Sequence, residues 1–199
     1  MENRRQAYFR SDFRVREETE GEVILEGYFI VYNQKIELWR GFTEEIMLGA
    51  CTESLRSGEN IMALFNHNRD LVIGSTQGRS LELIEDFAGV YGRVAINRED
   101  SDAMNVYQRV KRGDVQGCSF GFSIESEKYT NHDDGSVACQ IEKVKIYEVS
   151  ICPFPAYPTT SIQARKEEWE GQERRRLEEI RQIEERKAGL WRRLNAKNT

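Results

Sequence analysis

The sequence predicts a mainly β domain with a few helices (α+β), closed or partly closed into a barrel, followed by a charged helix. Two observations predict the barrel: several short segments alternate apolar and polar residues, and turn residues separate them. A third, the change to a Glu- and Arg-rich composition near the end, predicts the helix. Since about 150 residues is a common domain size, the 199 residues hold one core and an appendage.

The expected strands begin near the start of the chain. Phe13 and Val15 alternate with polar neighbours, and Val23 to Tyr32 is rich in β-branched and aromatic residues. The alternation continues in two later pairs, Leu81 with Leu83 and Val94 with Ile96. Together these segments predict a sheet of short strands.

A long or bent strand is expected from Val137 to Ile151. The Asp134-Gly135 turn signal predicts that it pairs back to Phe120–Ile124. All three prolines follow within residues 153–158, and because proline cannot donate to a sheet ladder, the strand must end or reach an edge there.

Two helices should interrupt the strands. A short one is expected from Thr52 to Ser57, ending at Gly58. A longer one is expected after a cap at Ser101-Asp102, with Gly113 placed to end it. Its apolar residues fall on one face, namely Ala103, Val106, Tyr107 and Val110.

The C-terminal segment differs from the body in charge. Residues 165–199 hold 11 Lys and Arg against 8 Asp and Glu, a balance of +3, so residues 1–164 carry 18 against 26, or −8. An acidic body argues against nucleic-acid binding. We expect a domain over 1–162 and a charged helical tail over 163–199. The narrow apolar seam of the tail would contact a partner, a second copy or a scaffold, and the alternative is a disordered tail. The seam consists of Trp169, Leu177, Ile180, Ile183, Leu190 and Leu194.

Several kinds of site are not expected. The four cysteines, Cys51, Cys118, Cys139 and Cys152, form no Cys-x-x-Cys pair and have no histidine at ligand spacing, so neither a disulfide frame nor a metal site is predicted. No cofactor motif is present. No run of eighteen apolar residues and no apolar signal region occurs, which predicts a soluble, unsecreted protein without membrane contact.

A serine hydrolase site is the chemistry that the rarest residues favour. The chain has two histidines, and His67 lies upstream of a run in which Ser119 follows Gly117-Cys118. A serine hydroxyl needs a base to become nucleophilic. Glu148 then interrupts an apolar strand, where a carboxylate could orient the imidazole. The predicted triad is therefore His67, Ser119 and Glu148.

Spacing leaves alternatives to each role. Cys118 could replace Ser119 as nucleophile, although adjacent residues of a strand point to opposite faces, so only one of them can meet His67. The other histidine, His132, lies in a polar turn. Four further carboxylates could replace Glu148 as the third member, namely Asp70, Asp86, Asp114 and Glu125.

Five ordered segments between about residues 10 and 162 resemble the prohead protease family of tailed bacteriophages, capsid-maturation serine proteases related in fold to the herpesvirus assemblins. They are EIMLGA (45–50), LFNHN (64–68), IGST (73–76), GDVQGCSFGF (113–122) and EVSICPFPAYP (148–158). By that likeness His67 matches the base, Ser119 the nucleophile and Glu148 the third member. The herpesvirus relatives use a second histidine in the third place, so this chain is expected to be the carboxylate version.

The resemblance also implies partners and a location. The expected substrates are the scaffold, or the scaffolding extension of the major capsid protein, and the protease itself, inside the assembling prohead in the host cytoplasm. By likeness to the assemblins, the Pro153 to Thr160 loop would help to bind the oxyanion. A homodimer or higher oligomer is left open. The alternative is a non-catalytic capsid or scaffold assembly protein, in which Ser119 would have no chemical task.

Overall fold

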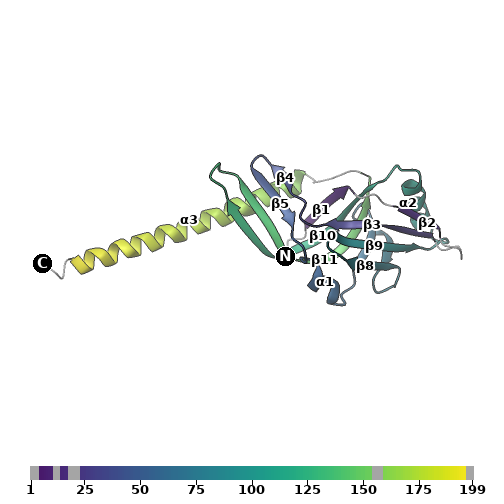
Figure 1. The fold of residues 1–199 in the computed structure, drawn as a ribbon, viewed down its shortest axis with the longest axis horizontal. Coiled ribbons are helices and arrows are strands. Elements are labelled where there is room, and N and C mark those ends of the chain that lie inside the picture. The colour runs from purple at the N-terminus through teal and green to yellow at the C-terminus, as the bar shows by residue number, and fades with distance from the viewer. Residues whose placement is uncertain (1–4, 11–13, 18–22, 154–158, 196–199) are drawn as a thin grey trace. The chain divides into compact units, whose positions relative to one another are not determined.

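A computed structural model describes residues 5–10, 14–17, 23–153 and 159–195. The chain divides into two compact units, residues 1–157 and 158–199. The first unit carries all the described strands and two helices, and the second carries one long helix (Figure 1). The body is thus mainly β with few helices, as the alternation of its sequence predicts.

A seven-stranded sheet forms the larger part of the body. Its main path runs β1 (Arg5–Arg10), β10 (Gly117–Asn131), β11 (Val137–Cys152), β5 (Phe42–Ile46) and β4 (Ile36–Trp39). The remaining two strands, β6 (Met62–Phe65) and β7 (Asn68–Ser75), join it through the end of β11. The first residues of β11 pair in parallel with β5 and its last residues pair in parallel with β6.

A four-stranded antiparallel sheet completes the body, in the order β2 (Arg14–Glu17), β3 (Val23–Val31), β9 (Gly89–Ile96) and β8 (Leu81–Glu85). The predicted strands at 23–32, 81–83 and 94–96 are found here, whereas Phe13 lies outside the described residues. The two sheets share a core rich in large side chains, including Phe29, Phe42, Phe120 and Phe122.

The sequence predicted a closed or partly closed barrel, and the described strands do not form a closed one. They make two separate sheets, and no pairing between described strands joins one sheet to the other. A physical reason lies in β11, because its edge is divided between β5 and β6. The larger sheet therefore splits at this strand, where a barrel would need one continuous ladder.

The long hairpin of β10 and β11 follows the predicted pairing. It turns at residues 132–136, where Gly135 adopts a φ of 81°. The register slips between Gly121 and Phe122, since Gly121 pairs with Glu148 but Phe122 pairs with Ile146, so Tyr147 is an extra residue in β11. Such a β-bulge changes the face toward which the following side chains point.

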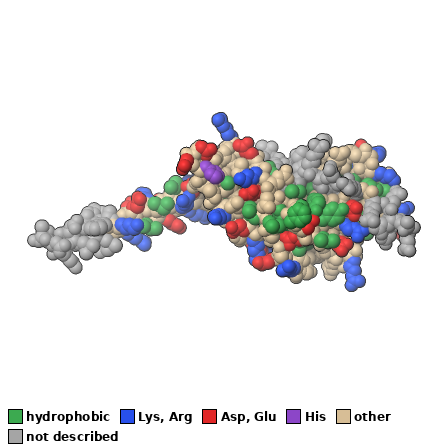
Figure 2. Space-filling view, viewed as in Figure 1, with side chains coloured by type: hydrophobic (Ala, Val, Ile, Leu, Met, Phe, Trp, Pro, Cys, Tyr) green, Lys and Arg blue, Asp and Glu red, His purple; other side chains and the backbone are tan. Residues whose placement is uncertain are grey.

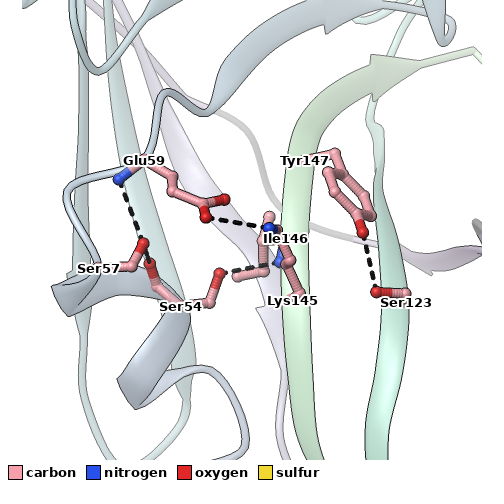
Figure 3. Close-up of polar contacts among 7 residues, drawn as sticks. All are labelled: Ser54, Ser57, Glu59, Ser123, Lys145, Ile146 and Tyr147. Atoms are coloured by element: carbon pink, nitrogen blue, oxygen red, sulfur yellow. Dashed lines mark hydrogen bonds and ion pairs between the residues drawn. The ribbon is translucent and has the colours of Figure 1, made fainter. Parts of the chain in front are cut away.

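Helix α1 (Thr52–Arg56) lies beside this bulge (Figure 3). The backbone N–H of Ile146 donates to Ser54 Oγ at 2.9 Å, and the Lys145 ammonium is 2.9 Å from a Glu59 carboxylate oxygen. The hydroxyl groups of Tyr147 and Ser123 are 3.0 Å apart. The loop between α1 and β6 is thereby tied to β11 just before Glu148.

Helix α2 (Ser101–Lys111) leads directly into β10. Its buried residues are the four predicted ones, Ala103, Val106, Tyr107 and Val110. The cap is one residue earlier than expected, because Asp100 has extended backbone angles and its carboxylate accepts from the N–H groups of Asp102 and Ala103. Gly113, at a φ of 81°, follows the end of the helix.

The second unit contains α3 (Thr159–Asn195). Its described side chains are mostly exposed, and Arg176 and Arg181 each form an ion pair with a glutamate three residues earlier. Three residues of the predicted apolar seam, Leu177, Ile180 and Ile183, are exposed. None of the helices in the described part of the chain is long and apolar enough to span a membrane. On the face shown in Figure 2, acidic and basic side chains are interspersed.

Candidate active site

His67 occupies a tight turn between β6 and β7. Asn66 and His67 have φ angles of 53° and 59°, the pair of positive values that a two-residue type I′ hairpin requires. Asn and His are among the residues that tolerate this conformation. Because β6 runs parallel to the end of β11, with Leu64 opposite Ser150 and Phe65 opposite Ile151, the turn lies beside β11.

Glu148 contacts the imidazole of His67. The distance between His67 Nδ1 and Glu148 Oε1 is 2.6 Å, and the two side chains are 16% and 14% exposed. An ionised carboxylate can only accept, so Nδ1 carries the proton and donates it. The other ring nitrogen, Nε2, is then the basic one, as a general base requires.

Ser150 connects both members of this pair. Its hydroxyl donates to Glu148 Oε2 at 2.6 Å and accepts from the backbone N–H of His67 at 3.2 Å. The residue is fully buried. One hydroxyl therefore holds the carboxylate and the turn that carries the imidazole.

Ser119 lies on the same sheet face as Glu148. It pairs with Ser150 in the antiparallel ladder, and two residues further Gly121 pairs with Glu148. Directly opposite residues share a face, and residues two apart on a strand share it too. All four residues are thus on one side of the β10 and β11 pair. Ser119 is 1% exposed.

The bulge at Tyr147 allows this arrangement. Ile146 pairs with Phe122 and is buried in the core, so without the extra residue Glu148, two positions later, would point into the core as well. The bulge reverses the alternation and turns Glu148 to the face of Ser119. Gly121 is also required, because a Cβ there would lie 2.5 Å from Glu148 Oε1.

Cys118 points to the opposite face. Its Sγ is 2.9 Å from the carbonyl oxygen of Tyr28 in the other sheet, and the residue is buried. This placement argues against Cys118 as the nucleophile. Cys152 is nearer to Glu148 in sequence, but burial raises the pKa of its thiol to about 12, so it is protonated near neutral pH.

The other candidate carboxylates have different surroundings. Asp86 accepts from Tyr28 Oη at 2.6 Å and from the N–H groups of Ala88 and Gly89, and the Tyr28 hydroxyl is the main cause of a lowered pKa of Asp86. Glu125 pairs with Lys143, Asp114 pairs with Arg112, and Asp70 is exposed.

His132 lies at the far end of the β10 and β11 hairpin, thirteen residues beyond Ser119. At about 3.3 Å per residue this is on the order of 40 Å along the strand. The predicted oxyanion loop, Pro153 to Thr160, lies largely outside the described residues. The structure thus brings His67 and Glu148 together and places Ser119 on their side of the sheet.

Sequence reasoning missed Ser150, Gly121 and the bulge. Ser150 follows Glu148 by two residues, and residues two apart on a strand lie on the same face. Nothing else in the sequence distinguished Ser150 from the other residues of that strand. The signal for the bulge is a change of phase in the apolar alternation, from Val144 and Ile146 to Val149 and Ile151, which sequence reasoning did not use.

Known proteins resemble this chain in sequence and in fold. Residues 11–175 match the family described as caudovirus prohead serine protease. The prohead protease of Enterobacteria phage HK97 is 30% identical over 145 residues, which are 72% of this chain and 60% of that relative. The chain thus spans about 60% of the length of the curated relative that it matches.

The solved structure of the bacteriophage T4 capsid assembly protease has a similar fold. The TM-score is 0.54 at 11% identity, and the match covers 76% of this chain and 98% of that one. At so low an identity the likeness concerns the fold alone.

Proposed function

Since this chain belongs to the caudovirus prohead serine protease family, we propose that it is a serine endopeptidase with Ser119 as nucleophile, His67 as general base and Glu148 as the residue that orients His67. The observation that carries the proposal is the 2.6 Å contact between His67 Nδ1 and Glu148 Oε1, on the sheet face to which the register assigns Ser119. A histidine held by a carboxylate on the side of a glycine-flanked serine is what acyl transfer needs.

The reaction proceeds in two acyl transfers. Ser119 Oγ attacks the scissile carbonyl carbon while His67 Nε2 takes its proton, and the imidazolium returns this proton to the leaving amine. Water then attacks the acyl carbon while the same nitrogen takes its proton, and the imidazolium returns this proton to Ser119 Oγ as the bond to the acyl group breaks and the acid product leaves. Glu148 keeps Nδ1 protonated throughout and stabilises the positive charge that the ring carries between the two proton transfers.

The substrates follow from the family and remain part of the proposal. We assign to this chain the scaffold or the scaffolding extension of the major capsid protein, together with its own chain, as targets inside the assembling prohead. The domain over 1–162 would perform the cleavage, and the charged tail over 163–199 would contact scaffold or a second copy. The exposed apolar residues of α3 are consistent with such a contact.

Co-expression with the cognate major capsid protein tests the function. We expect wild-type protein to shorten the capsid protein by a defined mass, and Ser119→Ala to leave it intact while keeping the wild-type circular dichroism spectrum. His67→Ala should be equally inactive, whereas His132→Ala, at the far end of the hairpin, should cleave at the wild-type rate. Undiminished cleavage by Ser119→Ala would contradict the proposal and favour an assembly protein without catalysis.

A further inference from the structure

The strand β1 lies along the strand that carries the proposed nucleophile (Figure 1). The two are antiparallel, and six consecutive residues pair without a bulge, from Arg5 opposite Phe122 to Arg10 opposite Gly117. Tyr8 is directly opposite Ser119. A segment from the start of the chain therefore borders the candidate active site.

A strand has two edges, and around Ser119 both edges of β10 are paired. One edge is held by β11, which carries Glu148 and Ser150 and is therefore part of the site. The other edge is held by β1. An extended peptide that adds to the sheet beside Ser119 can do so only at the edge that β1 covers, because displacing β11 would remove the catalytic carboxylate.

The pairing of β1 fits a replaceable strand. It is the terminal strand of its sheet, and among the described strands β10 is its one ladder partner. Its departure would leave the other ladders of the sheet intact. In the structure in which β1 is paired with β10, Ser119 is 1% exposed.

We propose that β1 is a built-in pseudosubstrate, which holds the edge of β10 that substrate peptides use and must leave before cleavage. The inference rests on the proposed function and adds to it the mode of substrate recognition. The substrate class is an extended segment that runs antiparallel to β10 and pairs with Gly117–Phe122. Main-chain hydrogen bonds to β10 supply affinity, and the protein stays inactive until a substrate competes with β1.

A disulfide between residue 9 and Cys118 would lock β1 in place. Phe9 is directly opposite Cys118, and opposite residues of an antiparallel pair have Cα atoms about 4.5 to 5.5 Å apart, within the range that a disulfide spans. In Phe9→Cys, mild oxidation should form this bond, which peptide mass mapping would identify. The matched control is Gln6→Cys, which introduces a thiol opposite Gly121, where no cysteine is available.

Cleavage of the cognate capsid protein is the readout, measured before and after reduction with dithiothreitol. Oxidised Phe9→Cys should lose at least tenfold in rate and recover it on reduction, whereas Gln6→Cys and wild type should be indifferent to the oxidant. Full activity of the disulfide-linked protein, or failure of residues 9 and 118 to link in the folded protein, would overturn the inference.

A second variant tests the opposite change, a weaker pairing of β1 with β10. Since successive N–H groups of a strand alternate in direction, replacing both Ala7 and Tyr8 by proline removes at least one donor to β10. This variant should raise kcat/KM severalfold, because less of the protein has the edge covered. An unchanged or lower value would count against the pseudosubstrate. If the wild type and all reduced variants failed to cleave, the proposed function itself would be wrong, and the inference with it.

Discussion

Gly121 provides the space in which the Glu148 carboxylate reaches His67. A Cβ at this position would lie 2.5 Å from Glu148 Oε1 and 3.0 Å from its Cγ, both too close for contact. The end of a glutamate side chain can turn away at little cost, so the strand itself need not be disrupted. The carboxylate, however, would have to leave its place beside Nδ1 of His67.

Gly121→Ala should therefore lower kcat by about tenfold to a thousandfold. A misoriented imidazole would lose about 1.4 to 4 kcal/mol of transition-state stabilisation, and each tenfold in rate corresponds to about 1.36 kcal/mol. Thermal melting should change little. The matched control is Gly171→Ala in α3, where the nearest atom to the added Cβ is 3.9 Å away. Wild-type kcat for Gly121→Ala would show that Glu148 does not act from the position seen here.

Ser150 contacts both Glu148 and the backbone of His67. Ser150→Ala removes a donor to Glu148 Oε2 and an acceptor of the His67 N–H group. Losing one buried hydrogen-bond partner costs about 1 to 3 kcal/mol. We expect kcat to fall by roughly ten- to a hundredfold with KM nearly unchanged, because the fully buried hydroxyl does not contact substrate.

Rescue distinguishes this positioning role from simple loss of packing. Ser150→Thr keeps the hydroxyl and should retain more activity than Ser150→Ala, even though its added methyl group must fit in a buried place. A rise in KM with constant kcat in Ser150→Ala would instead indicate contact with the substrate.

The candidate site was predictable at the residue scale only in part. Scarcity drew attention to His67, and the glycine-flanked run drew attention to Ser119, but neither observation contains a distance. Glu148 could not be separated from Asp86 or Asp114 by sequence, because what separates them is the partner each carboxylate has in the fold: His67 for Glu148, Tyr28 for Asp86 and Arg112 for Asp114.

At the scale of elements, the turn between β8 and β9 depends on one carboxylate. Asp86 accepts from the backbone N–H groups of Ala88 and Gly89 and from the Tyr28 hydroxyl of the neighbouring strand β3. Gly89 is required in the same turn, since a Cβ there would lie 1.9 Å from the carbonyl oxygen of Ile30. The turn is thereby fixed against β3.

Asp86→Asn should destabilise the body by about 1 to 3 kcal/mol near neutral pH, because an amide cannot replace a charged acceptor for Tyr28. The pKa of Asp86 is lowered in the folded protein, so its contribution is complete above the unfolded value of about 3.9 and is lost as the pH falls through the lower folded value. Urea unfolding of both proteins between pH 7 and pH 3 should show the difference shrinking below about pH 4. A difference that grew toward low pH would contradict this role.

The sequence pattern predicted some strands and missed how others pair. The alternation of Val23 to Tyr32 and the turn signal at Asp134-Gly135 predicted β3 and the β10 and β11 hairpin, since local pattern is all that these elements need. The parallel pairing of β11 with β5 and β6 was out of reach, because strand partners far apart in sequence leave no periodic signal. The bulge at Tyr147 does shift the alternation, from Val144 and Ile146 to Val149 and Ile151, but the direction in which Glu148 points becomes clear only with its partners across the sheet.

At the scale of the whole molecule, the three proposed catalytic residues and α3 belong to different compact units. His67, Ser119 and Glu148 all lie in residues 1–157, and the charged helix lies in 158–199. A closed barrel, one of the two forms that the sequence predicted, would have kept a single ladder around the body, whereas β11 divides its edge between two strands. The proposed chemistry and the proposed assembly contact of α3 can therefore be tested separately.

A protein ending at Ala164 should keep the cleavage rate of the full chain on unassembled capsid protein, because it retains the three proposed catalytic residues and the expected oxyanion loop. It should enter proheads poorly, since the exposed apolar residues of α3 would be missing. Sedimentation of particles and cleavage in solution, measured on the same protein, check both halves. Lost cleavage by a folded truncated protein would mean that the tail acts on the active site.

The position of β11 in the chain also has a consequence in time. It is the last of the described strands, and it supplies Glu148 and Ser150 and pairs with β10, β5 and β6. His67 leaves the ribosome 81 residues before Glu148, which at about 5 to 20 residues per second is a delay on the order of ten seconds. Throughout that delay the nascent chain has a histidine and then a serine but no partner to orient them. Biosynthesis itself thus keeps the proposed site unassembled until the body of the protein is nearly complete.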